Sequence, residues 1–326
     1  MGSIRPHNPA ALHTMLPRDT PYVDGPGTAP PLPFDLAVKV STALGQCPSD
    51  ESHALILQRK SALDASSPIL LFDSGVGGLT VLGELRDLLP DAPVIYAADM
   101  AGLPYGEKSE AEIAARVSGL LGRMAERYQP RLICIACNTA STIALGMVRE
   151  VLATPIVGTV PAIKPAAAMT RTGVIGLLGT EATIRQKYVD DLEQEFANGT
   201  RLLRFGAKDL VTLAEAKLRG EPVSADAVAD ACKGLVLQAH GNEIDTVVLA
   251  CTHFPLLERE LCEAFGPDVA FVHGAQGIAR RIAHLVEGQP MVRSRPDRAL
   301  TTGALADFEM LRSPLSQLGL DQLEKL

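Results

Sequence analysis

The chain has 326 residues, a net charge of −8 and 47% hydrophobic residues, which fits a compact soluble α/β protein of one large or two medium domains. An acidic chain suits a phosphate backbone poorly, so we exclude a dominant nucleic-acid role. No apolar run approaches the roughly 18–20 residues that span a bilayer, and no signal peptide opens the chain. We therefore expect a cytoplasmic protein without a membrane partner.

The N-terminal residues 1–67 differ in composition from the rest of the chain. Prolines recur between Pro6 and Pro33, and long apolar patterns are few, which predicts disorder over 1–35. Residues 36–62 could hold a short helix or two, or they could be an ordered cap or part of a tag-like leader, and the sequence leaves these alternatives open. We treat 1–67 as an N-terminal extension that is at least partly disordered.

A regular alternation of apolar runs and amphipathic stretches begins at Pro68. This alternation is typical of parallel strands that are covered by helices on both faces. Helices are predicted to start near Thr80, Ser109 and Thr139. The predicted strands are 69–73, 93–99, 131–137, 173–179, 201–206, 246–251 and 269–272.

Two segments of the chain look like copies of one plan. Leu132–Thr139 reads LICIACNT and Val247–His253 reads VVLACTH, and in each an apolar strand ends in Ala-Cys. The likeness indicates two similar α/β halves, with a boundary near residue 160. The expected first domain is 68–160 plus 270–326, and the expected second domain is 161–269.

Small polar residues follow the predicted strands, at the sheet edge where open α/β sheets bind their ligands. The loop Asp73–Gly78 has glycines that let a backbone approach a ligand closely, ahead of a helix start that favours an anion. It lacks the Walker lysine and the G-x-G-x-x-G spacing, so a carboxylate or phosphate cradle and an ordinary tight turn both stay open. The residues after the strands are Asp73-Ser74-Gly75, Asp99 to Gly106, Cys137-Asn138-Thr139, Thr180 and Cys251-Thr252-His253.

Six cysteines occur in the chain. In a cytosolic protein they are more often buried, catalytic or metal-binding than paired as disulfides. The C-x-x-C spacing of Cys134 and Cys137 allows a redox or zinc role. Residues three apart in a strand point to opposite faces, however, so we assign Cys134 to the core and Cys137 to the strand end.

The second strand-end cysteine, Cys251, stands two residues before His253, an arrangement that suggests nucleophilic catalysis or a metal site. Together with Cys137 it gives each half of the chain one thiol. Two weak acids on opposite sides of one ligand suit the removal of an α-proton from one face and delivery to the other. Such a stereoinversion requires neither a metal nor pyridoxal, and we expect no cofactor.

These residues resemble the glutamate racemase family. The matching stretches follow the family order over about 68–285, and their combination is specific although each motif alone is weak. They are Phe72–Thr80, Leu103–Gly106, Ala136–Ser141, Gly158–Lys164, Gly179–Ile184 and Ala250–Leu257.

The resemblance implies two similar three-layer α/β domains with mostly parallel sheets and an active site in the cleft between them. It also implies cofactor-independent interconversion of L-glutamate and D-glutamate, which supplies D-glutamate for peptidoglycan. Cys137 matches the base that acts on D-glutamate, and Cys251 the base that acts on L-glutamate. Glu215 falls where the family has an auxiliary carboxylate, although Gly206–Asp209 lacks the usual Cys-Pro and His273-Gly274 replaces a frequent Asp-Ser. The matched substrate contacts are Asp73, Ser74, Tyr105, Gly106, Asn138, Thr139, Thr180, Thr252 and His253.

The thiols need partners, because a free thiol is only a few per cent ionised at neutral pH. We expect Asp73 to serve Cys137 and His253 to serve Cys251. A carboxylate raises the pKa of a neighbouring thiol, so Asp73 is expected to accept and orient a proton. Asn138, Thr139 and Thr252 are the expected donors to the substrate carboxylate.

Several alternatives stay open at this stage. They are an aspartate racemase with another side-chain pocket, a small-acid-binding regulator with a dead site, a metal–thiolate protein and a pyridoxal enzyme using Lys164. The family includes several oligomeric arrangements, a homodimer among them, and the N-terminal extension is a candidate for binding a regulatory ligand.

Overall fold

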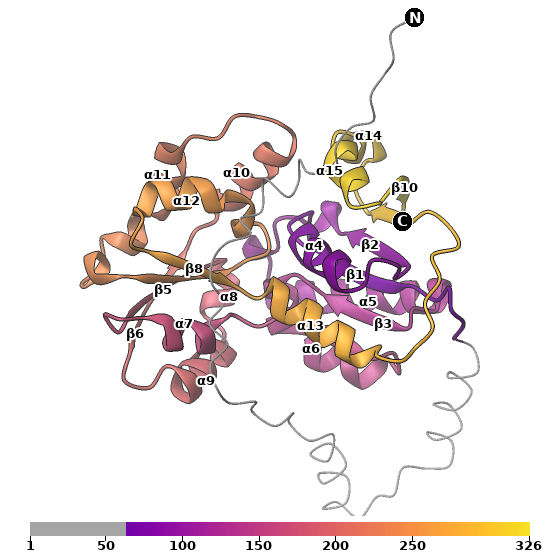
Figure 1. Ribbon diagram of the computed structural model, residues 1–326, viewed down its shortest axis with the longest axis horizontal. Helices are drawn as coiled ribbons and strands as arrows, with labels where there is room; N and C mark the ends of the chain where they lie inside the picture. Colours follow the sequence, from indigo (N-terminus) through magenta and orange to yellow (C-terminus); the bar gives the residue numbers. More distant parts are fainter. Residues whose placement is uncertain (1–62) are drawn as a thin grey trace, which may run out of the picture. The chain divides into compact units, whose positions relative to one another are not determined.

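The computed structural model describes residues 63–326, and residues 65–326 fall within one compact unit. The predictions for 1–35 and 36–62 lie outside the described residues. The described chain builds two lobes, each centred on its own parallel sheet (Figure 1). Within the described part, no helix has the length and apolar character needed to cross a membrane.

The first lobe contains a six-stranded sheet in which every paired strand is parallel. Helices α4 (Leu79–Leu88) and α13 (Ala275–Leu285) pack on one face, while α5 (Glu110–Tyr128) and α6 (Asn138–Val151) pack on the other. The strands, in sheet order, are β10 (Gln322–Lys325), β9 (Arg298–Thr301), β2 (Val94–Ala98), β1 (Ile69–Asp73), β3 (Leu132–Ile135) and β4 (Ile156–Gly158).

The second lobe contains a four-stranded parallel sheet in the order β6 (Arg201–Gly206), β5 (Val174–Gly179), β7 (Thr246–Ala250) and β8 (Ala270–His273). Apolar residues from helices on both faces cover this sheet. One face carries α10 (Asp209–Leu218), α11 (Ala225–Val236) and α12 (Glu258–Phe265), and the other carries α7 (Ile163–Met169) and α9 (Lys187–Phe196).

The two sheets share one strand order. Strands β2-β1-β3-β4 of the first lobe correspond to β6-β5-β7-β8 of the second, and β9 and β10 extend only the first sheet. The prediction of two similar three-layer α/β domains is thereby confirmed. Cys137 follows β3 and Cys251 follows β7, so the two thiols occupy equivalent places in the two lobes.

The amphipathic pattern of α5 explains how local sequence produces these layers. Its first turn is capped by Ser109, whose Oγ accepts a hydrogen bond from the Glu112 N–H at 3.2 Å. Ile113, Val117 and Leu121 recur at helical spacing and are fully buried against the sheet. The polar face of the helix stays exposed.

The chain crosses between the lobes after β4 and again after β8. The sequence placed the return to the first domain at residue 270, but Ala270–His273 pairs with β7 and lies in the second sheet. The helix that packs on α4 in the first lobe, α13, follows immediately. A short apolar run does not reveal which of two sheets it joins, so the pattern could not place this crossing at Gly274.

Candidate active site

The loop after β1 brings the first lobe into contact with the second. A Cβ on Gly77 would lie 2.6 Å from the His253 backbone nitrogen and 2.6 Å from Thr252 Oγ1. A Cβ on Gly75 would lie 3.1 Å from Glu215 Oε1. The glycines of this loop are therefore required by the close approach of the Cys-Thr-His segment, beyond any need of the turn itself.

Asp73 lies at the centre of this contact, and its side chain is completely buried. Its Oδ1 accepts a hydrogen bond from the Gly75 N–H at 2.8 Å, and its Oδ2 accepts one from Thr252 Oγ1 of the other lobe at 2.9 Å. Burial raises the pKa of Asp73, although His253 and the two hydrogen bonds oppose that rise. Asp73 thus holds a proton more readily than an exposed aspartate does.

Cys137 caps the first turn of α6. Its Sγ accepts a hydrogen bond from the Ala140 N–H at 3.4 Å and lies 3.4 Å from Ser74 Oγ. Ser74 Oγ is in turn 3.5 Å from Asp73 Oδ1, so the contact from Asp73 to the thiol runs through Ser74. Burial, followed by the charge of Asp73, raises the pKa of Cys137 to about 12. Cys137 is accordingly a thiol in the free protein.

Cys251 has a different neighbourhood in the second lobe. Its Sγ lies 3.9 Å from His253 Nδ1, and His253 Nε2 lies 2.9 Å from Glu215 Oε1. Burial alone would lower the pKa of His253, but Cys251 and Glu215 raise it well above its usual value. Burial would raise the pKa of Glu215, but His253 and Arg219 lower it. This side of the site therefore holds a charged imidazolium–carboxylate pair beside the thiol.

The structure shows where Glu215 lies, although the usual Cys-Pro is missing from the segment before it. Glu215 lies in α10 and is buried, with its carboxylate against His253. The register matched from the sequence thus brings this carboxylate into the predicted cluster.

A cluster of threonines joins the two lobes. Thr139 Oγ1, from the first turn of α6, lies 2.9 Å from Thr180 Oγ1 and 3.1 Å from Thr183 Oγ1. Thr180 caps the short helix α8 (Glu181–Ile184), and its Oγ1 lies 3.0 Å from Thr183 Oγ1. The sequence predicted Thr139 and Thr180 but missed Thr183. Its position three residues after a capping threonine was the signal that would have found it.

The Tyr105–Gly106 turn lies against the same cluster. Tyr105 is buried, and its hydroxyl donates a hydrogen bond to Asp99 Oδ2 at 2.6 Å. A Cβ on Gly106 would lie 3.0 Å from Thr180 Cβ, so the turn contacts the second lobe. Asn138 is buried at the first position of α6, next to Thr139. The predicted substrate contacts thus fall in one region at the carboxyl ends of both sheets.

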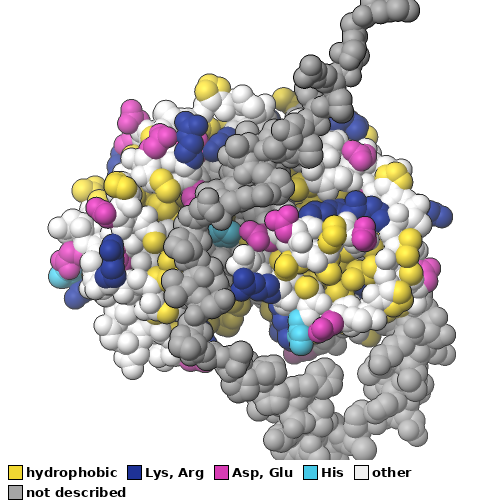
Figure 2. Space-filling view, in the orientation of Figure 1, with side chains coloured by type: hydrophobic (Ala, Val, Ile, Leu, Met, Phe, Trp, Pro, Cys, Tyr) yellow, Lys and Arg dark blue, Asp and Glu magenta, His cyan; other side chains and the backbone are white. Residues whose placement is uncertain are grey.

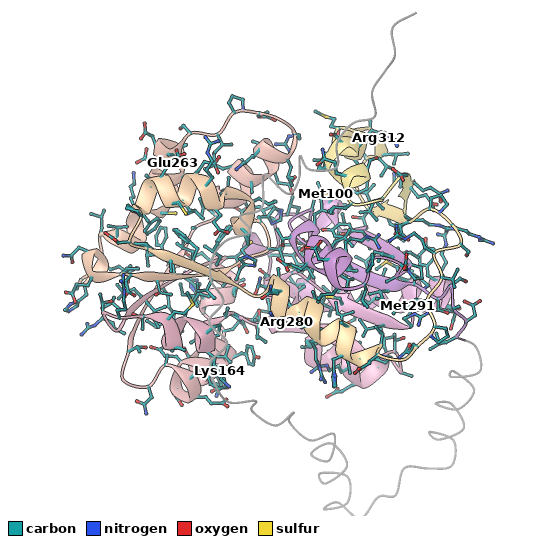
Figure 3. The ribbon with its side chains drawn as sticks, in the orientation of Figure 1. Met100, Lys164, Glu263, Arg280, Met291 and Arg312 are labelled. Atoms are coloured by element: carbon teal, nitrogen blue, oxygen red, sulfur yellow. The ribbon has the colours of Figure 1, made fainter. Side chains whose placement is uncertain are left out.

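The residues on which the redox, metal and pyridoxal alternatives depended are packed in the core or lie on another element. Cys134 is fully buried in the cluster on the α4 side of the sheet, whereas Cys137 belongs to the cluster on the α5 side, which confirms their opposite phases. Lys164 is exposed on α7, with its Nζ 5.1 Å from the centre of the Phe196 ring (Figure 3). Among the described residues, no group of three His, Cys, Asp or Glu side chains is arranged to hold a metal ion.

Acidic and basic side chains are interspersed on the face drawn in Figure 2.

Comparisons with known proteins agree with this geometry. The model of the Asp/Glu/Hydantoin racemase family matches residues 81–282. A glutamate racemase of Sphingopyxis alaskensis is 67% identical over 223 residues, covering 68% of this chain and 83% of that protein. A glutamate racemase of Escherichia coli is 44% identical over 264 residues, covering 79% of this chain and 90% of that protein.

Solved structures give the same result. The crystal structure of Escherichia coli glutamate racemase in complex with L-glutamate and the activator UDP-MurNAc-ala superimposes with a TM-score of 0.74 at 43% identity, covering 80% of this chain and 98% of that one. A glutamate racemase isoform from Bacillus anthracis gives 0.68 at 27% identity, covering 81% and 98%. The fold and the family match place the chain among the Asp/Glu/Hydantoin racemases, a class of isomerases. The relatives narrow this class, since the chain belongs to the glutamate racemase family.

Proposed function

We propose that the enzyme interconverts L-glutamate and D-glutamate with two thiols, Cys137 and Cys251, which act on opposite faces of the substrate α-carbon. The observation that carries the proposal is the equivalent place of the two thiols after the third strand of each lobe. Each thiol has its own buried polar partner within reach. One thiol removes the α-proton as thiolate while the other delivers a proton from the opposite side.

The two sides of the site would exchange protons by different routes. Cys137 acts on D-glutamate, and its proton passes to Asp73 through the Ser74 hydroxyl, which lies between them. The raised pKa of Asp73 suits it to accept that proton. Cys251 acts on L-glutamate, and the His253 imidazolium, held by Glu215, places a positive charge beside its sulfur. A cation beside the sulfur attracts the negative charge that the sulfur carries when it abstracts a proton.

The α-carboxylate of the substrate needs hydrogen-bond donors, because the charge that develops on the α-carbon spreads onto it. The distal carboxylate needs donors of its own to be bound. Asn138 and Thr139 are the donors that we assign to the α-carboxylate, together with the backbone N–H of Thr252, because the Thr252 hydroxyl already donates to Asp73. The hydroxyls of Thr180 and Thr183 and the Tyr105–Gly106 turn would hold the distal carboxylate. The hydrogen bonds among Thr139, Thr180 and Thr183 in the free protein would then be exchanged for bonds to the ligand.

The structure of the Escherichia coli relative holds L-glutamate and an activator. The first ligand supports glutamate as the substrate, and the second supports regulation by a bound ligand. We extend both features to this enzyme: glutamate as substrate, and a regulatory ligand of related kind. The product D-glutamate would supply peptidoglycan synthesis in the cytoplasm. A homodimer stays a prediction.

Proton exchange in deuterated water tests the mechanism. Purified wild type should racemise both enantiomers of glutamate and leave aspartate largely unchanged. Cys137→Ser and Cys251→Ser should each abolish racemisation, and each should lose α-proton exchange more severely for one enantiomer. Cys262→Ser, which alters an exposed cysteine on α12, is the matched control and should keep wild-type rates. Near-normal turnover in either site variant would overturn the two-thiol scheme.

A further inference from the structure

Asp99 is a buried carboxylate that the mechanism above does not use. It follows β2, at the same sheet edge as Asp73 and Cys137, and its side chain is completely buried. Its Oδ2 accepts hydrogen bonds from the Tyr105 hydroxyl at 2.6 Å and from Arg116 Nε. Its Oδ1 accepts from Arg116 Nη2 at 2.6 Å and from Thr302 Oγ1 at 2.5 Å. Four donors from three parts of the chain thus converge on one carboxylate.

The backbone between Asp99 and Tyr105 is wrapped tightly around this carboxylate. A Cβ on Gly102 would lie 2.4 Å from Asp99 Oδ2 and 2.6 Å from Arg116 Nε, so the close wrapping requires glycine. Thr302, which follows β9, also accepts a hydrogen bond from the Ala101 N–H at 3.0 Å. The segment is therefore tied to helix α5 through Arg116 and to the C-terminal part of the first lobe through Thr302.

The Tyr105 hydroxyl has a single proton, and that proton is directed at Asp99. The phenol therefore has no proton to donate to a substrate carboxylate, and Tyr105 acts on that group through its ring and through the backbone of the turn. The next residue, Gly106, contacts Thr180 of the second lobe. Thr180 in turn bonds to Thr139. Thr180 also lies 3.0 Å from Thr183 Oγ1, so a chain of contacts leads from Asp99 to the two threonines that we assign to the distal carboxylate.

We propose that Asp99, held by Arg116 and Thr302, is a positioning residue that fixes the Tyr105–Gly106 turn against Thr180 and so sets the affinity for the distal carboxylate of the substrate. The proposal rests on the function proposed above. Hydrogen bonds to an ionised carboxylate are shorter and stronger than neutral ones, so Asp99 holds the turn more rigidly than an amide would. Burial alone would raise the pKa of Asp99, but Arg116, Thr302 and Tyr105 lower it, so the carboxylate is ionised at neutral pH.

Steady-state kinetics of two conservative variants test this role. Asp99→Asn keeps the size of the side chain and removes its charge, while Tyr105→Phe keeps the ring and removes the hydroxyl. Because a displacement of about 1 Å at a binding element can cost roughly 100-fold, each variant should raise KM for both enantiomers about tenfold or more. The fall in kcat should be several times smaller than the rise in KM. Since both changes weaken the same Asp99–Tyr105 hydrogen bond, the double variant should raise KM little beyond the single ones.

A buried carboxylate at the opposite end of β2 supplies the matched control. Asp297 pairs with Arg86 and accepts a hydrogen bond from the Val94 N–H at 2.8 Å. Asp297→Asn should lower the thermal unfolding temperature, as Asp99→Asn should, but leave KM within about twofold of wild type because it lies away from the turn. A KM in Asp99→Asn and Tyr105→Phe no higher than in Asp297→Asn would overturn the positioning role. If Asp99→Asn does not fold, Tyr105→Phe alone decides. Wild type that fails to racemise glutamate would instead overturn the proposed function.

Discussion

His253 Nε2 lies 2.9 Å from Glu215 Oε1, and both side chains are almost completely buried. Glu215 comes from α10 and His253 from the segment after β7, so both belong to the second lobe. Each partner offsets the cost of burying the other's charge. The pair therefore presents a fixed positive charge to Cys251, whereas Cys137 has a negatively charged neighbour in Asp73.

Glu215→Gln should impair the Cys251 side of the reaction. The amide cannot neutralise an imidazolium, so the pKa of His253 should fall from its raised value, although Cys251, which also raises it, stays in place. A contribution typical of general acid–base groups predicts a drop in kcat/KM of about 100-fold or more for L-glutamate. The pH–rate profile should shift its alkaline limb to lower pH. Glu260→Gln, which changes another buried carboxylate of this lobe that pairs with Lys217, should keep the wild-type profile. An unchanged profile in Glu215→Gln would contradict the assigned role.

Ser74→Ala should affect mainly the Cys137 side. The hydroxyl is the link between the thiol and Asp73, so its removal should slow proton abstraction from D-glutamate by about 10- to 100-fold. Deuterium wash-in from each enantiomer, measured separately by NMR, distinguishes the two sides. Equal losses for both enantiomers would show that Ser74 serves substrate binding in general and not this route.

The thiol of Cys137 should stay protonated in the free enzyme well above neutral pH. Burial and the charge of Asp73 raise its pKa to about 12, compared with about 8.5 for a free cysteine. Thiolate absorbance at 240 nm, followed from pH 7 to about 10.5, should therefore be the same in wild type and in Cys137→Ser. A thiolate step near pH 8.5 that disappears in the variant would contradict the buried environment.

The stability of the fold should decline in alkali for a related reason. Burial raises the pKa of Cys232, a core residue of α11, to about 12, so the folded protein keeps a proton that the unfolded chain loses above about pH 8.5. This stabilisation is fully present below that pH and is lost as the pH rises toward 12. Each such thiol lowers the free energy of unfolding by at most about 1.4 kcal/mol per pH unit. Urea unfolding at several pH values should show a shallower decline for Cys232→Ala, and an identical slope would contradict it.

The positions of the two proposed thiols could be predicted because each lies at the end of a strand. Cys137 and Cys251 follow long apolar runs, and the phase of the strand separated Cys137 from Cys134. The short strand β4 and the C-terminal strands β9 and β10 were missed, because three or four residues without strong alternation do not stand out. The hydrogen bond between Asp99 and Tyr105 could not be predicted from the sequence either. Hydrogen bonds between residues such as Asp99 and Thr302 depend on which segments pack together, and no local pattern encodes that.

Gly77→Ala should lower activity by moving the loop after β1. A Cβ at this position would lie 2.6 Å from the His253 backbone nitrogen, so the loop after β1 must move away from the Cys-Thr-His segment. A shift of about 1 Å between the two sides of the site should cost roughly 100-fold in kcat/KM for both enantiomers. Gly119→Ala is the control, because Gly119 is an exposed residue of α5 with open space around its Cβ position. That change should leave kcat/KM unaltered and raise the free energy of unfolding by about 0.5–1 kcal/mol. Wild-type kinetics in Gly77→Ala would mean that the lobes need not approach this closely for turnover.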